Sequence, residues 1–301
     1  MFEQTSKNLL QWMALLPPER RSKLGTRLAD RLVNALRLTG PIETNLGMND
    51  SLRISYPEPR HRSSVFGTPA DYLGERGALF SVEALLPHAD SFIDIGSNLG
   101  YFTFFAKTRA PKTPVHFFEP TPRLFSFIEQ MCARNGFHDF FGHRAAIGAA
   151  SEAARFFIDT EDPGRSSLDG TQGFPKGCEA IDVEMIRFAD FAEKHSQLQR
   201  MLVKVDVENA EMDFLRGVGQ AWDRISYLVV EVLLPAHKQG FINATRQASG
   251  MHAYYIKDFT LEHSADGTFH YQAPEHNWLF ARETPEQLRQ KLLGSRFQVL
   301  G

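Results

Sequence analysis

Nearly continuous apolar runs alternate with amphipathic segments from residue 90 onward. Four of these runs carry an acid at or near their end: "SFIDI" (91–95), "PVHFFE" (114–119), "MLVKVDVE" (201–208) and "ISYLVVEV" (225–232). The segment "TPRLFSFIEQMCARNG" repeats apolar residues at helical spacing, with Thr121 as N-cap and Gly136 beyond its end. Buried strands that alternate with helices predict an α/β protein with a parallel, doubly wound sheet covered on both faces.

Later segments extend this pattern to the end of the chain. Their spacing predicts further strands at 141–148, 154–159, 179–186, 253–259 and 277–283, and further helices at 70–86, 100–109, 210–218, 236–250 and 284–294. The Gly- and Pro-rich stretch 159–177 predicts a long loop, in which Arg165, Ser166 and Ser167 either contact a substrate or belong to a solvated hairpin.

The first 75 residues follow a different pattern. "RLADRLVNALRL" (27–38) spaces leucines for a helix that Gly40 and Pro41 end, and "ISY" (54–56) predicts a short strand. We therefore expect a helical extension over 1–75, serving as a cap or as a homo-oligomer contact. We expect a single catalytic domain over 76–301.

Composition narrows the class of protein. The 301 residues are 43% hydrophobic and 23% charged, which is ordinary for a globular protein, and the net charge of −3 does not favour a nucleic-acid partner. Two cysteines in no metal motif fit a reducing, cytoplasmic setting. No run approaches the roughly 18 apolar residues of a transmembrane segment, and "NLLQWMALLPP" lacks the basic flank of a signal peptide.

The stretch "FIDIGSNLGYFTFF" (92–105) raises the main chemical question. Ligands of doubly wound sheets bind beyond the carboxyl ends of the strands, and Gly96 and Gly100 would let a ligand approach the backbone there. Glu119 follows at the distance where an acid bonds ribose hydroxyls. Asn98 interrupts the dinucleotide fingerprint, and Asp94 would repel a pyrophosphate but would suit an ammonium group. A nucleoside joined to a cationic amino acid describes S-adenosylmethionine.

Three alternatives stay open for this stretch. The glycine loop would also fit an ordinary turn between a strand and a helix. A nicotinamide-dependent oxidoreductase is the alternative enzyme class, although the missing glycine of the fingerprint and Asp94 argue against it. A non-catalytic nucleoside-binding module would retain the same sheet.

Three linked motifs resemble a known family. "FIDIGSNLGYFTFFA", "VHFFEPTPRLFSFIEQMCARNG" and "LVKVDVENAEMDFLRGV…ISYLVVEV" are similar to those of FkbM methyltransferases, over about residues 80–282. The resemblance implies a class I methyltransferase (Rossmann-like) fold and S-adenosylmethionine-dependent methylation of hydroxyls on sugars, glycans or small natural products. Ser97 replaces the usual alanine and Asn209 the usual glycine, and asparagine tolerates left-handed backbone angles.

The resemblance also implies roles for individual residues. The methionine part of the cofactor would be cradled by Asp94, Gly96, Asn98 and Gly100. Glu119 would bind the ribose, with Pro120 shaping the loop. The adenine would be bordered by residues near Arg144, Ala145 and Ala146. Asp206 and Glu208 would face the reacting centre.

Transfer to a hydroxyl needs a group that accepts its proton. Asp206 is the first candidate for this base and Glu208 the second, with His143 and His237 as weaker candidates. Asp206, Glu208 and Glu231 would also suit Mg²⁺ or Ca²⁺ as oxygen ligands; the sequence does not demand a metal, so we assign no metal ligand and a divalent ion stays open as a second cofactor.

Overall fold

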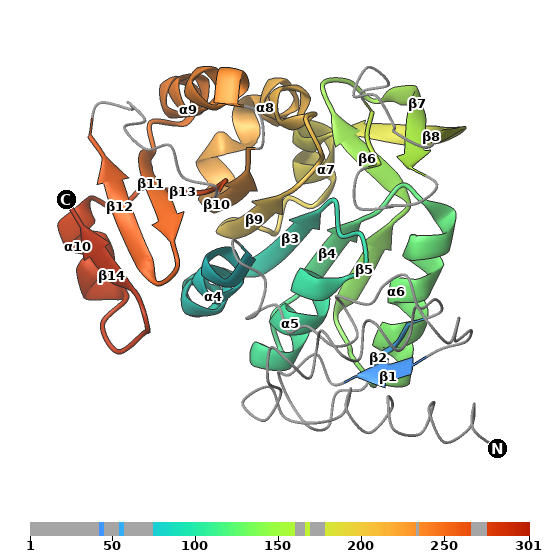
Figure 1. Cartoon of the computed structure of the whole chain (residues 1–301), viewed down its shortest axis with the longest axis horizontal. Coiled ribbons are helices and arrows are strands. Elements are labelled where there is room, and N and C mark those ends of the chain that lie inside the picture. The colour runs from blue at the N-terminus through green and yellow to red at the C-terminus, as the bar shows by residue number, and fades with distance from the viewer. Residues whose placement is uncertain are drawn as a thin grey trace, which may run out of the picture.

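Nine strands form one twisted sheet within the described residues, which are 42–44, 54–56, 75–159, 166–168, 178–232, 235–265 and 276–301 of a computed structural model (Figure 1). The strands follow the order β14 (Gln298–Leu300), β12 (Thr260–Ser264), β11 (His252–Lys257), β13 (Asn277–Ala281), β10 (Ile225–Glu231), β9 (Met201–Val205), β3 (Ser91–Ile95), β4 (Val115–Phe118) and β5 (Phe140–His143). The order β5-β4-β3-β9-β10 is that of a doubly wound sheet, with its switch point between β3 and β9.

The doubly wound α/β fold is confirmed, but the sheet is mixed rather than parallel throughout. Strands β10, β9, β3, β4 and β5 are parallel to their neighbours in that order, whereas β13 runs antiparallel to β10 and to β11. The residues of β13 are all buried, as they are in β3 and β9. A strand that is covered on both faces is apolar along its whole length, whether it runs parallel or antiparallel to its neighbours. The hydrophobic pattern therefore carried no information on the orientation of β13.

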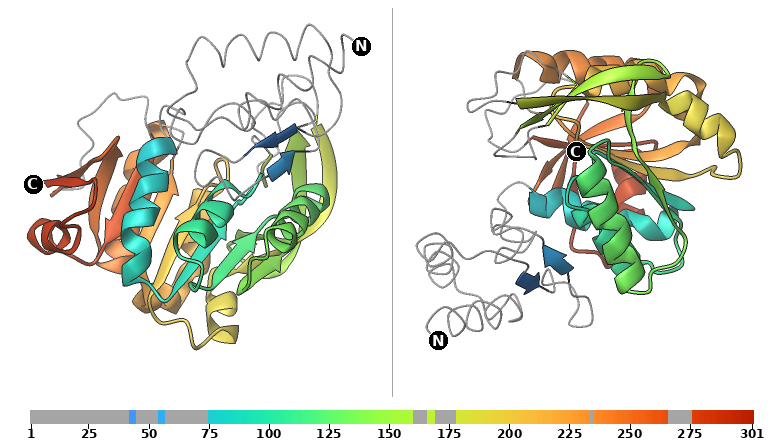
Figure 2. Two further views of the ribbon diagram at one scale, coloured as in Figure 1. Left: turned by 90° about the horizontal axis from the view of Figure 1, so that it is seen from below. Right: turned by 90° about the vertical axis from the view of Figure 1, so that its right-hand side faces the viewer.

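Helices cover both faces of this sheet, and alternate side chains of each strand serve the two cores. Phe92, Leu202 and Val229 belong to the core under α4 and α5, while Ile93, Val203 and Val230 belong to the core under α7, α8 and α9. Figure 2 shows α5 and α9 on opposite sides of the strands. The helices are α4 (Glu75–Leu85), η2 (Leu86–His88), α5 (Tyr101–Arg109), α6 (Pro122–Arg134), α7 (Phe188–Lys194), α8 (Glu211–Val218), η4 (Gly219–Arg224), α9 (Pro235–Ser249) and α10 (Pro285–Lys291). No described helix has the length and apolar character that crossing a membrane requires.

The predicted strand 141–148 proves to be two strands in two sheets. Its first half is the end of β5, and after Arg144 the chain enters β6 (Ala145–Gly148). Strand β6 pairs with β8 (Cys178–Arg187), which pairs in turn with β7 (Glu152–Asp159). Figure 1 shows this small sheet beyond the end toward which β3 and β4 point. It therefore borders the place where a doubly wound sheet binds ligands.

The N-terminal prediction is only partly covered by the described residues. Strand β2 (Ile54–Tyr56) confirms the predicted short strand, and it pairs antiparallel with β1 (Ile42–Thr44). The predicted helix 27–38 and the expected oligomer contact lie outside the described residues.

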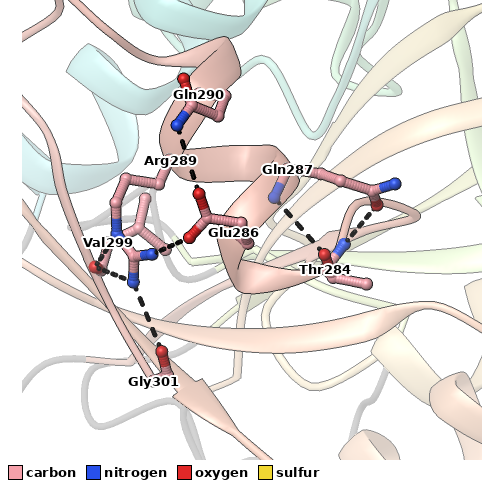
Figure 3. A network of polar contacts seen from close by, with 7 residues as sticks. All are labelled: Thr284, Glu286, Gln287, Arg289, Gln290, Val299 and Gly301. Atoms are coloured by element: carbon pink, nitrogen blue, oxygen red, sulfur yellow. Dashed lines mark hydrogen bonds and ion pairs between the residues drawn. The ribbon is translucent and has the colours of Figure 1, made fainter.

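Polar contacts tie the C-terminal strand to the last helix (Figure 3). Thr284 and Gln287 form a reciprocal capping box at the start of α10. From the next turn, the Arg289 guanidinium donates to the carbonyls of Val299 and Gly301, at 3.2–3.3 Å. Strand β14 is thereby held at the edge of the sheet, beside β12.

One glycine lets helix α8 pack directly on the small sheet, close to the ligand-binding edge. A Cβ built on Gly217 of α8 would lie 2.1 Å from the carbonyl oxygen of Gly148, at the end of β6. Only glycine lets α8 pack this closely on β6. The contact matters because α8 follows the Asp206–Glu208 segment, whereas β6 carries Ala145 and Ala146.

We expect Gly217→Ala to destabilise the protein by about 2 kcal/mol, because the added methyl must push α8 away from β6. Gly240→Ala in α9 is the matched control, since no described atom lies within 4 Å of its added Cβ. Its expected effect is a gain of up to about 1 kcal/mol, from alanine's higher helix propensity. Urea unfolding measures both, and equal effects of the two substitutions would contradict this packing role.

Candidate active site

The loop after β3 lies against the end of β9. Asp206 N donates to Ile95 O at 3.1 Å, while Gly96 N and Ser97 N donate to Phe118 O at 3.1 and 3.0 Å. Gly96 has φ +77°, and a Cβ there would lie 1.8 Å from Asp206 O. The absence of a side chain at Gly96 therefore lets the ends of three neighbouring strands meet.

The same loop then turns sharply into α5. Asn98 has φ +49° and Gly100 has φ +76°, and Gly100 N donates to Ser97 O at 2.7 Å. A Cβ at Gly100 would approach the Phe104 ring to 2.8 Å. Gly100 thus supports the turn from the side of α5, and it does not line the neighbouring cleft.

A cleft opens where these strand ends meet the small sheet. Of the predicted residues, it is lined by Gly96, Asn98, Glu119, Pro120, Ala145, Asp206 and Glu208. Eight further lining residues were not predicted: Ile95, Phe118, Thr121, Ile147, Phe156, Leu168, Val207 and Ala210. Several of these adjoin a predicted position in sequence, so the strand-end motifs could have indicated them. Phe156 and Leu168 come from β7 and the segment 166–168, and no motif marks them.

Glu119 links two sides of the cleft. Its Oε2 accepts a hydrogen bond from Asn98 N at 2.9 Å, and its Oε1 accepts one from Thr121 N at 2.8 Å. The side chain is buried, and this burial raises the pKa of Glu119 to about 7, although the hydrogen bonds from Thr121 and Asn98 oppose the shift. One carboxyl group therefore holds the β3 loop against the β4 loop.

Asp94 lies beneath the loop rather than in the cleft. It is fully buried, and Thr103 of α5 donates to its Oδ2 at 2.7 Å. Burial raises the pKa of Asp94, and the nearby Lys204 ammonium opposes this shift. Because Asp94 shares a strand face with Phe92, its side chain points toward α5. The predicted contact between Asp94 and a methionyl group remains a prediction.

Lys204 joins the acids of β3 and β9. It is the register partner of Asp94, and its Nζ lies 3.0 Å from Asp206 Oδ2 and 4.6 Å from the centre of the Phe102 ring. The lysine is only 5% exposed. Its ammonium group forms an ion pair with the Asp206 carboxylate, and this ion pair holds the carboxylate at the wall of the cleft.

The turn after Asp206 carries the second predicted acid. Glu208 and Asn209 have φ +48° and +75°, so asparagine does adopt the left-handed backbone expected at this position. Ser167 Oγ donates to Glu208 O at 2.6 Å, and Asn209 N donates to Glu211 Oε1 at 3.0 Å. Ser167 therefore fastens the segment 166–168 to the turn.

The loop predicted over 159–177 is described only at 166–168. Ser166 lines the cleft, whereas Ser167 makes the contact with the Glu208 turn. Arg165 lies outside the described residues. Ser166 thus lies beside the cleft, and its contact with a substrate remains a prediction.

Three buried oxygens around this site lack a hydrogen-bond partner among the described residues. They are Asp94 Oδ1, Asn98 Oδ1 and Asn209 Oδ1. A buried acceptor left unsatisfied costs about 1–3 kcal/mol, so such atoms suit a ligand that brings N–H or O–H groups. Of these three residues only Asn98 lines the cleft, and its Oδ1 together with the Glu119 carboxyl fits a cofactor with an ammonium group and ribose hydroxyls.

The remaining candidates do not join this site. Within the described residues, Asp206, Glu208 and Glu231 do not form a group whose carboxylate oxygens lie close enough to hold one ion. His143 and Arg144 do not line the cleft, although Ala146 does. The side chain of His237 lies outside the described part of the structure.

Comparison with known proteins identifies the family. Residues 94–271 match the Methyltransferase FkbM domain family. The chain belongs to this family. The resemblance predicted from the three strand-end motifs is therefore confirmed.

Two relatives cover similar shares of the chain. "Methyltransferase 1" of Beauveria bassiana is 33% identical over 161 residues, which are 48% of this chain and 65% of that protein. The 31-O-demethyl-FK506 methyltransferase FkbM of Streptomyces tacrolimicus is 29% identical over 172 residues, with the same two coverages of 48% and 65%. The match thus spans slightly less than two thirds of each relative.

Solved structures show weaker similarity. The N-terminal domain of human METTL16 in complex with SAH aligns with a TM-score of 0.40 at 11% identity, covering 70% of this chain and 71% of that chain. TrmK of M. capricolum, in complex with S-adenosyl-homocysteine, aligns with a TM-score of 0.36 at 11% identity, covering 67% and 66%.

The raised pKa of Glu119 predicts a pH-dependent stability. Its pKa rises from 4.5 to about 7 on folding, so the folded protein keeps a proton that the unfolded chain releases. The resulting stabilisation is fully present below the unfolded pKa and is lost as the pH rises toward the folded one. Glu211, whose pKa burial also raises to about 7, adds a second contribution of the same sign.

The unfolding free energy of the wild-type protein should fall as the pH rises from 4.5 to about 7. In Glu119→Gln this fall should be smaller by about 2 kcal/mol, because glutamine does not titrate. Urea unfolding at a series of pH values measures the slope. Glu129→Gln, at an exposed position of α6, should keep the wild-type slope. An unchanged slope in the Glu119 variant would show that this carboxyl does not titrate between pH 4.5 and about 7.

Proposed function

We propose that this protein is an S-adenosylmethionine-dependent O-methyltransferase that acts on a hydroxyl of a sugar, a glycan or a small natural product. The observation that carries the proposal is the cleft at the switch point, where the unsatisfied Oδ1 of Asn98 lies beside the carboxyl groups of Glu119 and Asp206. Membership of the FkbM family supports the same assignment. Neither the cleft nor the family match favours the alternative of a nicotinamide-dependent oxidoreductase.

The proposed cofactor contacts divide along the cleft. The unsatisfied Oδ1 of Asn98, which lines the cleft, would serve as an acceptor for an ammonium group, with Asp94 beneath the loop. Glu119 would exchange its present hydrogen bond from Asn98 N, in part, for bonds from ribose hydroxyls. Ala145 and Ile147, with the Phe118 ring, offer an apolar wall for a planar base.

Positioning and proton removal are the tasks left to the protein. The cofactor supplies a methyl group activated on a sulfonium, so holding the acceptor oxygen in line with it accounts for most of the required rate. Asp206 is the proposed base, because its carboxylate lines the cleft and its ion pair with Lys204 holds it in one orientation. Glu208 lines the same cleft from the following turn and is the second candidate.

The acceptor side of the cleft supports a small hydroxylated substrate. Phe156 and Leu168 offer apolar surface, and Ser166 offers a hydroxyl, in the same cleft as Asp206 and Glu208. The name of the Streptomyces relative refers to an O-demethyl substrate, which favours oxygen as the methyl acceptor.

Two substitutions separate cofactor binding from chemistry. Glu119→Ala should weaken S-adenosylhomocysteine binding at least tenfold, because it removes the proposed ribose acceptor. Asp206→Asn should leave that affinity within a few-fold but lower the methylation rate by about 10²–10⁴, the usual effect of losing a base. Calorimetric titration gives the affinities, and transfer of labelled methyl groups to hydroxylated acceptors gives the rates.

Glu129→Ala, at an exposed position of α6, is the control and should alter neither property. Binding of NAD without binding of S-adenosylhomocysteine would overturn the proposal and favour an oxidoreductase. An equal loss of binding and turnover in Asp206→Asn would refute the role of Asp206 as base while leaving the methyltransferase assignment intact.

A further inference from the structure

Three histidines meet on the α7 side of the sheet, and none of them lines the cleft. His116 belongs to β4, His143 ends β5, and His195 follows the last turn of α7. One ring nitrogen of each lies within 4.8 Å of the others, and His116 Nδ1 is 3.1 Å from His143 Nε2. We call these residues the histidine cluster. No further group of three or more potential metal ligands occurs among the described residues.

We propose that the histidine cluster binds one divalent transition-metal ion of the Zn²⁺ class. Two imidazole nitrogens on a tetrahedral zinc ion, each bonded at about 2.0–2.1 Å, stand about 3.4 Å apart. The pair formed by His116 and His143 is already close to this separation, at 3.1 Å. The longest separation is at most 4.8 Å, so binding requires at least one ring to move by up to about 1.4 Å.

Burial lowers the pKa of all three rings. Burial, together with repulsion from the neighbouring histidines, lowers the pKa of His116 to about 3. Burial is also the main cause that lowers the pKa of His143 to about 4, and it lowers the pKa of His195 as well. His116 Nδ1 and His143 Nε2 lie at hydrogen-bond distance, so one of these two nitrogens carries the shared hydrogen and must give it up, to the other nitrogen of its ring, before both can bind an ion.

The surroundings hold the three rings in place. His143 stacks on Phe118 at 4.4 Å between ring centres, and His116 stacks on Phe141 at 4.8 Å. His195 packs against Phe191 at 4.6 Å, and the Arg224 guanidinium donates to its backbone carbonyl. The turn that carries His195 is thus fixed by a second element.

Charge limits the affinity of this site. Lys194 lowers the pKa of both His143 and His195, and Arg224 lowers that of His195, so both positive groups act on the cluster. They would oppose a dication, and among the described residues no carboxylate joins the three rings. We therefore expect micromolar rather than tighter binding, with water as the fourth ligand.

The test uses the full chain after removal of metals with a chelator. Titration with Zn²⁺ by calorimetry should give one equivalent of micromolar affinity, and Co²⁺ should show the visible bands of a four-coordinate ion. His195→Ala and His143→Phe should each weaken Zn²⁺ binding at least tenfold. The His195 position is only partly buried, so its variant should remain folded, which thermal unfolding without metal verifies.

A second histidine pair supplies the matched control. His252 Nδ1 and His263 Nε2 lie 3.2 Å apart on β11 and β12, outside the cluster. His263→Phe should keep wild-type Zn²⁺ affinity. The proposal is overturned if the wild-type chain shows no saturable Zn²⁺ binding, or if His263→Phe weakens binding as much as His195→Ala does.

Discussion

The close approach of Gly96 to the backbone of Asp206 is the constraint on which the cleft depends. Any side chain at Gly96 would overlap Asp206 O, with a Cβ only 1.8 Å away. This contact brings the β3 loop against the end of β9, at the point where the strand order reverses. Glu119 then holds the β4 loop at the same place through Asn98 N. The three strand ends thus form one surface instead of three separate loops.

Buried ionisable groups are concentrated around that surface. Asp94, Glu119 and Lys204 are all nearly inaccessible, although burying such groups is costly unless they are paired or hydrogen-bonded. Some of this cost is left uncompensated within the described residues, as the unsatisfied Oδ1 of Asp94 indicates. Asn98 Oδ1 is also unsatisfied and belongs to a residue of the cleft lining, so a ligand that donates a hydrogen bond to it would be bound more tightly.

The sequence was informative where one local rule determined the structure. Apolar runs located β3, β4, β9 and β10, and the acids and glycines at their ends located the part of the cleft formed by Gly96, Glu119, Asp206 and Glu208. Side-chain direction was available too, because the period of two places Asp94 on the face of Phe92, toward α5. Contacts between distant segments carried no such signal.

The contribution of Phe156 to the cleft and the meeting of His116 with His195 depend on how the sheets and helices pack, which no local pattern specifies. The short strands β12 and β14 also escaped prediction, since their residues lack a long apolar run.

The passage of the chain from β5 to β6 at Arg144 has a consequence for how this protein can change. One wall of the cleft belongs to the large sheet, whereas Phe156 and Leu168 belong to the small sheet and its adjoining segment. Substitutions or insertions there leave the Gly96–Asp206 contact untouched. For the proposed methyltransferase, replacement of β7 and of residues 166–168 is therefore the simplest route to a different acceptor, because the strand ends that carry the proposed chemistry stay unchanged.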